Sequence, residues 1–360
     1  MGRRRERDAV GGVLPVRSER LKGTSMGHGR GPLVRGGAGT SRPVTVGRAL
    51  LGLAAAALGL VTAAALLARH WWAFDLLSHF RPQYAILGAA LCPAALALRA
   101  RPAAALLGAV ALIHGWAVKD LWLGGDETMS GGRALRVASA NVQVSNPTPE
   151  RLLDFARAES PDVLLVVEAQ DERWRGTLAG LDALYSHRAP AGDLPEGAPL
   201  ILFSRLPILA ADEAPTAGRR PRLLAELALD GGGRTLAVVG VHPASPSPTG
   251  ARDSRVRNLQ LDGLAGRAGG VEGPIIVAGD FNTTPWSPHF RDLLAEAGLR
   301  HAAAGQGWTA TWPSWLWWPA RIPIDHVLVG GPLRVTSFGP GPFIGSDHYP
   351  VVADLRLDPG

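Results

Sequence analysis

The sequence has one cysteine, Cys92. A single cysteine excludes an intrachain disulfide and leaves the redox compartment of the protein undetermined. Because Cys92 lies in an apolar run, we interpret it as a small buried side chain rather than a reactive thiol. The chain has no HExxH motif and no cysteine cluster, which disfavours zinc chemistry. It also shows no internal repeat and no heptad pattern.

Most of the chain lacks an excess of positive charge. The whole sequence has 37 basic and 31 acidic residues, and residues 1–48 alone hold eleven of the basic and three of the acidic ones. The remaining residues therefore carry 26 basic and 28 acidic side chains, a net charge of −2. The region 192–199 has no array of Lys or Arg that could grip a duplex. Because DNA binding depends on cationic contacts with phosphates, nucleic acid is the less favoured partner.

The first 48 residues are rich in Gly and Arg and have only scattered apolar side chains. Such a segment cannot bury enough surface to offset its chain entropy. We predict that residues 1–48 form a disordered basic tail on the cytoplasmic side of a membrane.

Three uncharged apolar stretches follow the tail. They are Ala49 to Ala68, Pro82 to Leu98 and Pro102 to Val118, of 20, 17 and 17 residues. A bilayer core of about 30 Å needs about 20 residues of helix, with a range of about 17–25. We therefore predict a three-helix transmembrane region over residues 49–123. A cleaved signal peptide is the alternative for the first stretch, and soluble core helices are the alternative for the other two.

The distribution of positive charge predicts the orientation of these helices. The basic tail, together with Arg99 and Arg101 between the second and third stretches, should lie on the cytoplasmic side. Trp71, Trp116 and Trp122 then fall near the outer ends, where an aromatic belt is expected. We therefore expect a multi-pass protein of the cell membrane whose bulk, from about residue 134, faces outward.

From Ala134 onward, short strand-like runs alternate with helical patterns. The predicted strands are 135–142, 162–169, 199–206, 223–229, 235–242, 274–281, 324–329 and 349–357. The predicted helices are 148–159, 254–268 and 287–298. Several strands are apolar on both faces and have helices between them, so we predict an α/β domain with packed sheets flanked by helices.

Polar residues recur where these apolar strands end or begin. They are Asn141, Glu168, His242, Asp280, Asn282, Asp325, His326, Asp347 and His348. Each one alone is explained equally well as a cap, a turn residue or a structural histidine. Together they supply the oxygen ligands that Mg²⁺ prefers, and groups able to position a water and to donate protons. Hydrolysis of a phosphate ester needs this inventory.

The ordered series resembles the endonuclease/exonuclease/phosphatase superfamily over about residues 134–357. The elements that carry the resemblance are Asn141, Glu168, His242, the GDFN sequence at 279–282, Ile324-Asp325-His326 and the SDHYP sequence at 346–350. The superfamily includes deoxyribonucleases, apurinic endonucleases, sphingomyelinases and inositol-polyphosphate phosphatases. The resemblance implies a four-layered α/β sandwich with two central β-sheets, and Mg²⁺ as cofactor with Mn²⁺ as the alternative ion.

The resemblance also implies a role for each carboxylate and amide. Glu168 would hold the metal, assisted by Asn141 and Asp347. Asp280 would orient or deprotonate the attacking water, and Asn282 would bind the phosphate.

The histidines have implied roles as well. His348 would act as the acid/base or as a donor in the transition state, with its imidazole oriented by Asp325. His242 would donate to the phosphate or to the leaving group. The sequence departs from the deoxyribonuclease type after Glu168 and around His242, which lies in an HPASP sequence.

Three apolar stretches followed by such a domain resemble, more narrowly, the membrane-anchored glycopeptide-resistance proteins of the VanJ-like kind. Antibiotic resistance is implied by this resemblance only. The tryptophan-rich stretch 308–318 adds a second membrane signal, because indole rings favour the bilayer interface. Packing in a loop and stacking on a nucleobase remain its alternatives.

Three functions stay in competition on the sequence alone. The favoured one is a membrane-anchored Mg²⁺-dependent phosphoesterase that acts outside the cytoplasm on a phospholipid or a polyprenyl phosphate or pyrophosphate. The second is an extracytoplasmic nuclease, and the third is a binding domain without catalysis. The sequence leaves the oligomeric state open.

Overall fold

The computed structural model describes residues 42–126, 131–170, 172–190, 200–217, 221–231, 233–246 and 254–358. Of the predicted disordered tail, residues 42–48 are helical, and the rest of that tail lies outside the described residues. The region 192–199 lies outside them too. The helices and sheets described below belong to one compact unit, Arg42–Gly360.

The apolar stretches form helices, of which α1 is long and apolar enough to cross a membrane. The helices are α1 (Arg42–Leu66), α2 (Trp72–Ser78), α3 (Arg81–Ala97) and α4 (Arg101–Ala117), followed by the 3₁₀ turn η1 (Lys119–Leu121). In the described part of the chain, α1, with 25 residues, is the one helix long and apolar enough to cross a membrane. The helices α3 and α4 have 17 residues each. At about 1.5 Å per residue each spans about 26 Å, less than the ~30 Å of a bilayer core. The prediction of three transmembrane helices is therefore not supported.

Small residues lie between these helices, and large apolar ones point away from them. Ala55, Ala95 and Ala104 form a buried core with Leu107. A Cβ atom on Gly88 of α3 would come within 2.8 Å of the Leu107 carbonyl oxygen of α4, so the two backbones approach closely. The exposed side chains include Leu50, Leu53, Leu60, Ile86, Leu96, Leu106 and Leu112.

The rest of the chain forms two six-stranded mixed sheets. The first has the strand order β11-β12-β1-β2-β4-β3, and the second has the order β5-β6-β7-β8-β10-β9. The strands of the first sheet are β11 (Leu333–Pro340), β12 (Val351–Leu357), β1 (Arg133–Asn141), β2 (Val163–Val167), β4 (Leu200–Ser204) and β3 (His187–Ala189). Those of the second are β5 (Ile208–Ala214), β6 (Arg222–Ala228), β7 (Thr235–Val241), β8 (Ile275–Asp280), β10 (Asp325–Gly330) and β9 (Arg300–His301).

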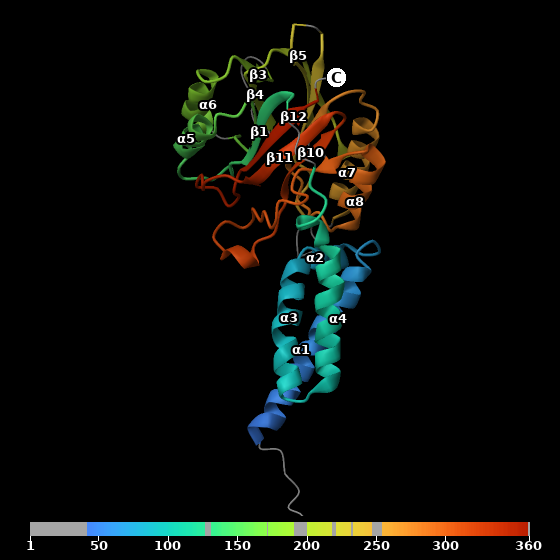
Figure 1. The fold of residues 1–360 in the computed structure, drawn as a ribbon. Coiled ribbons are helices and arrows are strands. Elements are labelled where there is room, and N and C mark those ends of the chain that lie inside the picture. Colours follow the sequence, from blue (N-terminus) through green and yellow to red (C-terminus); the bar gives the residue numbers. More distant parts are fainter. Residues whose placement is uncertain are drawn as a thin grey trace, which may run out of the picture. The chain divides into compact units, whose positions relative to one another are not determined.

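The alternation of side chains along each strand builds four layers (Figure 1). Val137 and Val163 of the first sheet join Ile276 of the second in one core between the sheets. Their neighbours Ala138 and Leu164 face the outer helices of the first sheet. These helices are α5 (Glu150–Glu159) and α6 (Arg175–Asp182), with the 3₁₀ turn η2 (Glu172–Trp174) between them.

The second sheet is covered in the same way on its outer face. Val239 and Val277 pack against α7 (Arg255–Ala268) and α8 (Pro288–Ala297). The layers are thus two helices, a sheet, a sheet and two helices, an α/β sandwich of the expected class.

One parallel pair of strands lies at the centre of each sheet, β1 with β2 and β7 with β8. Parallel strands bring their carboxyl ends to the same edge of a sheet. The first residues after these strands are therefore the ones that the fold gathers at one end of the sandwich.

Each of the eight predicted strands overlaps a strand of the structure, and the three predicted helices correspond to α5, α7 and α8. The sequence analysis missed β3, β5, β9 and β11, and the short helices α2 and α6.

Candidate active site

The carboxyl ends of the central strands supply four of the predicted site residues. Asn141 is the last residue of β1 and Asp280 the last residue of β8. Glu168 directly follows β2 and His242 directly follows β7. The strand order of the two sheets therefore brings together residues that are far apart in the sequence.

Asp280 is the centre of the hydrogen-bonded cluster. Its Oδ2 accepts a hydrogen bond of 3.0 Å from Asn141 Nδ2, and its Oδ1 accepts one of 2.8 Å from the main-chain N–H of Asn282. His242 Nε2 and His348 Nε2 lie 3.7 and 3.8 Å from the same Oδ2. Burial raises the pKa of the Asp280 carboxyl to about 7, although the imidazolium of His348 acts in the opposite direction.

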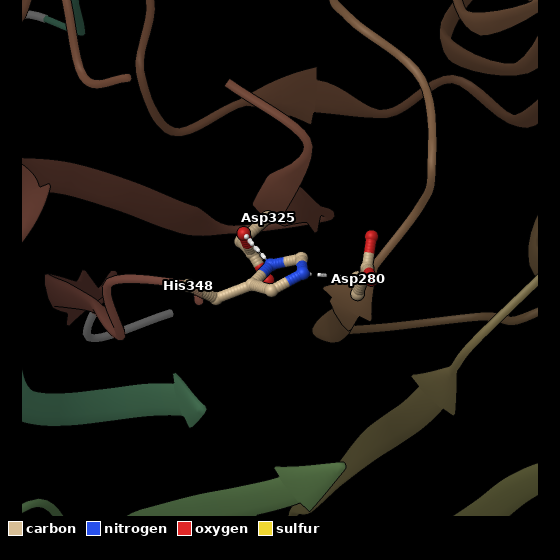
Figure 2. A group of neighbouring side chains, drawn as sticks. All are labelled: Asp280, Asp325 and His348. Carbon is tan, nitrogen blue, oxygen red and sulfur yellow. Dashed lines mark hydrogen bonds and ion pairs between the residues drawn. The ribbon is translucent and has the colours of Figure 1, made fainter. Parts of the chain in front are cut away.

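His348 lies between two buried carboxylates, as Figure 2 shows. Its Nδ1 makes a hydrogen bond of 2.8 Å with Oδ2 of Asp325, which is the residue paired with Asp280 across β10 and β8. Burial lowers the pKa of His348, but the charges of Asp325 and Asp280 outweigh this effect and raise it to about 10. The imidazole is therefore held as a cation whose Nε2–H is directed toward Asp280.

Glu168 and Asp347 are the more exposed carboxylates of the site. Their side chains are 26% and 23% exposed, while those of Asp280 and Asp325 are almost fully buried. Glu168 has a left-handed backbone, with φ of +71°. Its Oε1 lies 3.4 Å from His242 Nε2. Asp347 Oδ2 accepts a hydrogen bond of 3.3 Å from Trp312 Nε1.

These residues open into a cavity of about 400 Å³. Six of the eight predicted site residues line it, namely Glu168, His242, Asp280, Asn282, Asp347 and His348. The other two, Asn141 and Asp325, lie behind it and make hydrogen bonds to Asp280 and His348. The structure thus brings all eight residues together.

The oxygen donors of this cavity fit a hard divalent cation. Glu168 and Asp347 both line the cavity, and Asn141 lies against Asp280 beside them. Mg²⁺ prefers one or two carboxylates and keeps several of its waters, so this donor set is sufficient.

One glycine makes the close contact between β7 and β8 possible. Gly279 has φ of +145°, and a Cβ atom there would lie 1.9 Å from the carbonyl oxygen of Val241. The GDFN sequence therefore needs glycine directly before Asp280.

The contribution of the segment that follows α1 was not predicted from the sequence. Leu76, His79 and Phe80, from the end of α2 and the residues after it, line the same cavity. A signal for their role was present, because Asp75 is a lone acid in the apolar sequence WAFDLLS. A charge in such a surrounding indicates a buried partner.

The sequence matches the Endonuclease/Exonuclease/phosphatase family over residues 138–348, more than half of the chain. The chain belongs to this family. Members of the endonuclease/exonuclease/phosphatase family are usually metal-dependent hydrolases of phosphate esters. No curated protein matches the sequence.

Solved structures of this family share the fold. The endonuclease/exonuclease/phosphatase from Bacteroides vulgatus is 19% identical with a TM-score of 0.50, over 63% of this chain and 100% of that chain. A mutant of beta toxin from Staphylococcus aureus with bound magnesium ions is 15% identical with a TM-score of 0.50, over 63% and 100%. Humanized D. rerio TDP2 is 17% identical with a TM-score of 0.50, over 62% and 99%. At these identities the likeness concerns the fold alone.

Proposed function

We propose that the protein is a membrane-anchored, Mg²⁺-dependent phosphoesterase that hydrolyses a phosphate, phosphodiester or pyrophosphate bond of an envelope lipid outside the cytoplasm. The observation that carries the proposal is the composition of the 400 Å³ cavity, whose lining combines acids and imidazoles with apolar side chains, among them Leu76 and Phe80 of the segment between α1 and α3.

The chemistry follows from the charge states of the buried groups. Asp280, as a carboxylate, holds and orients the attacking water, while Asn141 and the Asn282 amide fix the carboxylate plane. His348, held as a cation by Asp325, donates from Nε2 to an oxygen of the phosphate. His242 donates to the phosphate or to the leaving group, and the Asn282 side chain binds a phosphate oxygen.

Glu168 and Asp347 would hold Mg²⁺, or Mn²⁺ as the alternative, with Asn141 assisting. The ion supplies Lewis-acid polarisation of the phosphate and neutralises part of its negative charge. Beta toxin, which has the same fold, binds magnesium ions, and this supports the choice of ion.

The apolar side of the cavity supports a lipid substrate. Leu76, Phe80, Ile322 and Ile324 line the cavity together with Trp312. Polar small molecules do not need such a wall, whereas the first carbons of a lipid chain can be buried against it. Leu76 and Phe80 come from the segment between α1 and α3, whereas Trp312, Ile322 and Ile324 come from the segment between β9 and β10.

The helical segment supports anchoring in a membrane. α1 is long and apolar enough to span the bilayer, and its small-residue contacts with α3 and α4 are of the kind that membrane helices use. We propose that α1 anchors the chain in the membrane, with α3 and α4 packed against it.

Positive charge at one end of these helices supports an outward-facing catalytic domain. The guanidinium of Arg48 donates a hydrogen bond of 2.6 Å to the carbonyl oxygen of Leu98, so the start of α1 and the loop between α3 and α4 lie at the same end. Arg99 and Arg101 belong to that loop and to the start of α4. The other end of α4 contacts the sandwich, since Arg291 donates to the carbonyl oxygen of Ala117. The positive-inside tendency then places the sandwich outside.

The test is a substrate panel with the full-length protein in detergent micelles and Mg²⁺. Polyprenyl pyrophosphate, polyprenyl phosphate, phospholipids and linear and supercoiled DNA are compared at equal phosphate concentration. We expect release of phosphate or a headgroup from a lipid, abolished by EDTA and by Asp280→Ala.

Three other outcomes would overturn the proposal in different ways. Cleavage of DNA alone, with a steep salt dependence, would identify an extracytoplasmic nuclease. A full cellular phenotype retained by Asp280→Ala would indicate a binding domain without catalysis. A reporter fused after residue 358 that is active in the cytoplasm would contradict the outward orientation.

A further inference from the structure

A fully buried ion pair joins the membrane-proximal helix α2 to the sandwich. The guanidinium of Arg257, in the first turn of α7, contacts the carboxylate of Asp75 in α2. The two side chains are 0% and 1% exposed. Removing two charges from water is costly, and a well-packed apolar pair would often serve stability as well. We therefore ask whether this ion pair has a role in the active site in addition to connecting α2 to α7.

The ion pair is connected to the loop that carries Asn282. Arg257 Nη1 donates a hydrogen bond of 3.0 Å to the main-chain oxygen of Asn282. Ser287, at the far end of the same loop, donates from Oγ to Asp75 Oδ1 over 2.9 Å. Asp75 and Arg257 therefore hold both ends of the loop 282–287. Asn282 itself has a left-handed backbone with φ of +51°, a conformation that asparagine adopts more readily than most other non-glycine residues.

His79 adds a third contact between this segment and the loop. Its Nδ1 lies 2.9 Å from Thr284 Oγ1, and its Nε2 lies 3.5 Å from Arg257 Nη1. A guanidinium can only donate, so Nε2 is the acceptor and Nδ1 carries the proton directed at Thr284. His79 also lines the cavity that holds His348 and Asp280. The segment 75–80 thus contacts the loop 282–287 and also lines the candidate active-site cavity.

We infer that Asp75 and Arg257 are positioning residues of the active site, which set the backbone of Asn282 so that its side chain can bind the phosphate. This inference rests on the proposed function for the role of Asn282. Under it, α2 completes the catalytic site, and the sandwich alone lacks the contacts that hold its phosphate-binding loop.

The test compares variants of the full-length protein in detergent, with bis(p-nitrophenyl) phosphate and Mg²⁺ as the probe reaction. Asp75→Asn removes the charge but keeps the shape, and Arg257→Lys keeps the charge but loses the fork that reaches Asn282 and Asp75 together. We expect both to lower kcat by roughly 10- to 100-fold with little change in KM, since misplacement of a catalytic group costs about that much.

Asp292→Asn is the matched control. Asp292 of α8 forms a bidentate ion pair with Arg69, which lies between α1 and α2, so the pair also connects the helical segment to the sandwich. In the described part of the chain, neither of these two side chains forms a hydrogen bond with the loop 282–287. This variant should keep the activity of the unmodified protein.

A double-mutant cycle separates positioning from general stability. Asp75→Asn should add little further loss to Asn282→Ala, because both act on the same interaction, whereas independent effects would multiply. If Asp75→Asn fails to fold, Arg257→Lys and the milder Ser287→Ala, which removes one hydrogen bond to Asp75, are measured in its place with the same expectation.

Hydrogen–deuterium exchange gives a readout that does not depend on activity. Peptides covering residues 279–287 should exchange faster in Asp75→Asn and Arg257→Lys than in Asp292→Asn. Unchanged exchange there, or unchanged kcat in both variants, overturns the inference. If the unmodified protein cleaves no phosphate ester, the proposed function is wrong. The exchange data then still show whether the conformation of the loop 282–287 depends on α2.

Discussion

Two buried residues of the site, Asp280 and His348, are charged over the same range of pH. Burial raises the pKa of Asp280 to about 7, and the flanking acids raise that of His348 to about 10 against the effect of its own burial. Between these values Asp280 is an anion and His348 is a cation. Water activation and donation to the phosphate require these two forms.

The first prediction concerns the pH dependence of activity. The rate should rise as pH passes through about 7, where Asp280 loses its proton, and fall near pH 10, where His348 loses its own. Asp325→Asn removes the charge that favours the imidazolium, so the alkaline limb should move to lower pH, toward the ordinary histidine value of about 6.5. The measurement is kcat/KM from pH 5 to 11 for both proteins. An alkaline limb that stays in place in Asp325→Asn would exclude His348 as the group that titrates there.

The second prediction concerns metal binding by the two more exposed acids. Glu168→Gln and Asp347→Asn should raise the Mg²⁺ concentration needed for half-maximal activity by about tenfold or more, because each removes a charged oxygen ligand. After EDTA treatment, activity is titrated with Mg²⁺ and with Mn²⁺. Glu172→Gln is the control, since Glu172 lies close in sequence but forms an exposed pair with Arg175. An equal Mg²⁺ requirement in all variants would place the ion elsewhere.

The site residues were predictable from the sequence because they end strands whose apolar pattern is clear. Asn141, Glu168, His242 and Asp280 each close a central strand that is buried on both faces. Asp75 and Arg257 were not predicted. Their proposed role depends on a contact between residues 182 positions apart in the sequence. Neither residue lies at a strand end or in a recognisable motif.

At the scale of elements, the missed strands are those whose sequences do not carry the buried pattern. β5 is an edge strand whose residues from Leu209 to Glu213 are exposed, so it has no apolar face to detect. β11 is also an edge strand and ends in Gly339-Pro340, which ordinarily argues against a strand. Backbone pairing with β6 and β12 determines these two strands, and pairing is not visible in a single sequence.

The start of α8 shows a second limit of prediction from local sequence. The Ser287 hydroxyl, which the sequence pattern assigns to the start of α8, donates to Asp75 and makes no capping bond to the helix. The helix begins at Pro288 all the same, because proline at the first position has a suitable φ and lacks the N–H that a cap would satisfy. Ser287 therefore forms a tertiary contact with Asp75 instead of capping the helix.

The third prediction tests the approach of β7 to β8. Gly279→Ala should destabilise the fold by about 2 kcal/mol or more and lower activity, because the new Cβ would collide with the Val241 carbonyl and the backbone at φ of +145° disfavours a side chain. Gly263→Ala in α7 is the control, since nothing lies within 4 Å of its Cβ position and alanine favours a helix. It should be neutral or more stable by roughly 0.5–1 kcal/mol. Thermal and urea unfolding of the full-length protein measure both, and equal stability would contradict the close contact.

At the scale of the whole molecule, the tryptophan-rich segment links the cavity to an exposed apolar surface. Trp312 lines the cavity, while Trp315 and Trp317 are 68% and 80% exposed. The segment is held to the start of α3, where Gln83 Nε2 donates to the carbonyl oxygens of Pro319 and Arg321 over 3.1 and 3.0 Å. The tryptophan-rich segment is therefore attached to the start of α3, which packs against the helix that we place in the membrane. Packing in a loop, the alternative for this stretch, fits Trp312 but not Trp315 and Trp317.

The last prediction follows from that position. If the indoles of Trp315 and Trp317 enter the outer leaflet, they hold the mouth of the cavity at the depth of lipid headgroups. The double variant Trp315→Ser/Trp317→Ser should then lower the rate on a lipid phosphate in vesicles by about tenfold or more, since each large side chain loses ~1–3 kcal/mol of burial. The rate on bis(p-nitrophenyl) phosphate, which needs no bilayer, should stay unchanged.

Leu209→Ser provides the matched control, because Leu209 is 58% exposed on the edge strand β5 and lies outside the tryptophan segment. It should leave both rates unchanged. Equal losses on the vesicle and the soluble substrate in the tryptophan variant would mean that the segment supports Trp312 and Asp347 within the site rather than the membrane. A loss of the rate on vesicles alone would mean that the two indoles position the cavity at the bilayer. It would also support a lipid substrate that is reached from the outer surface.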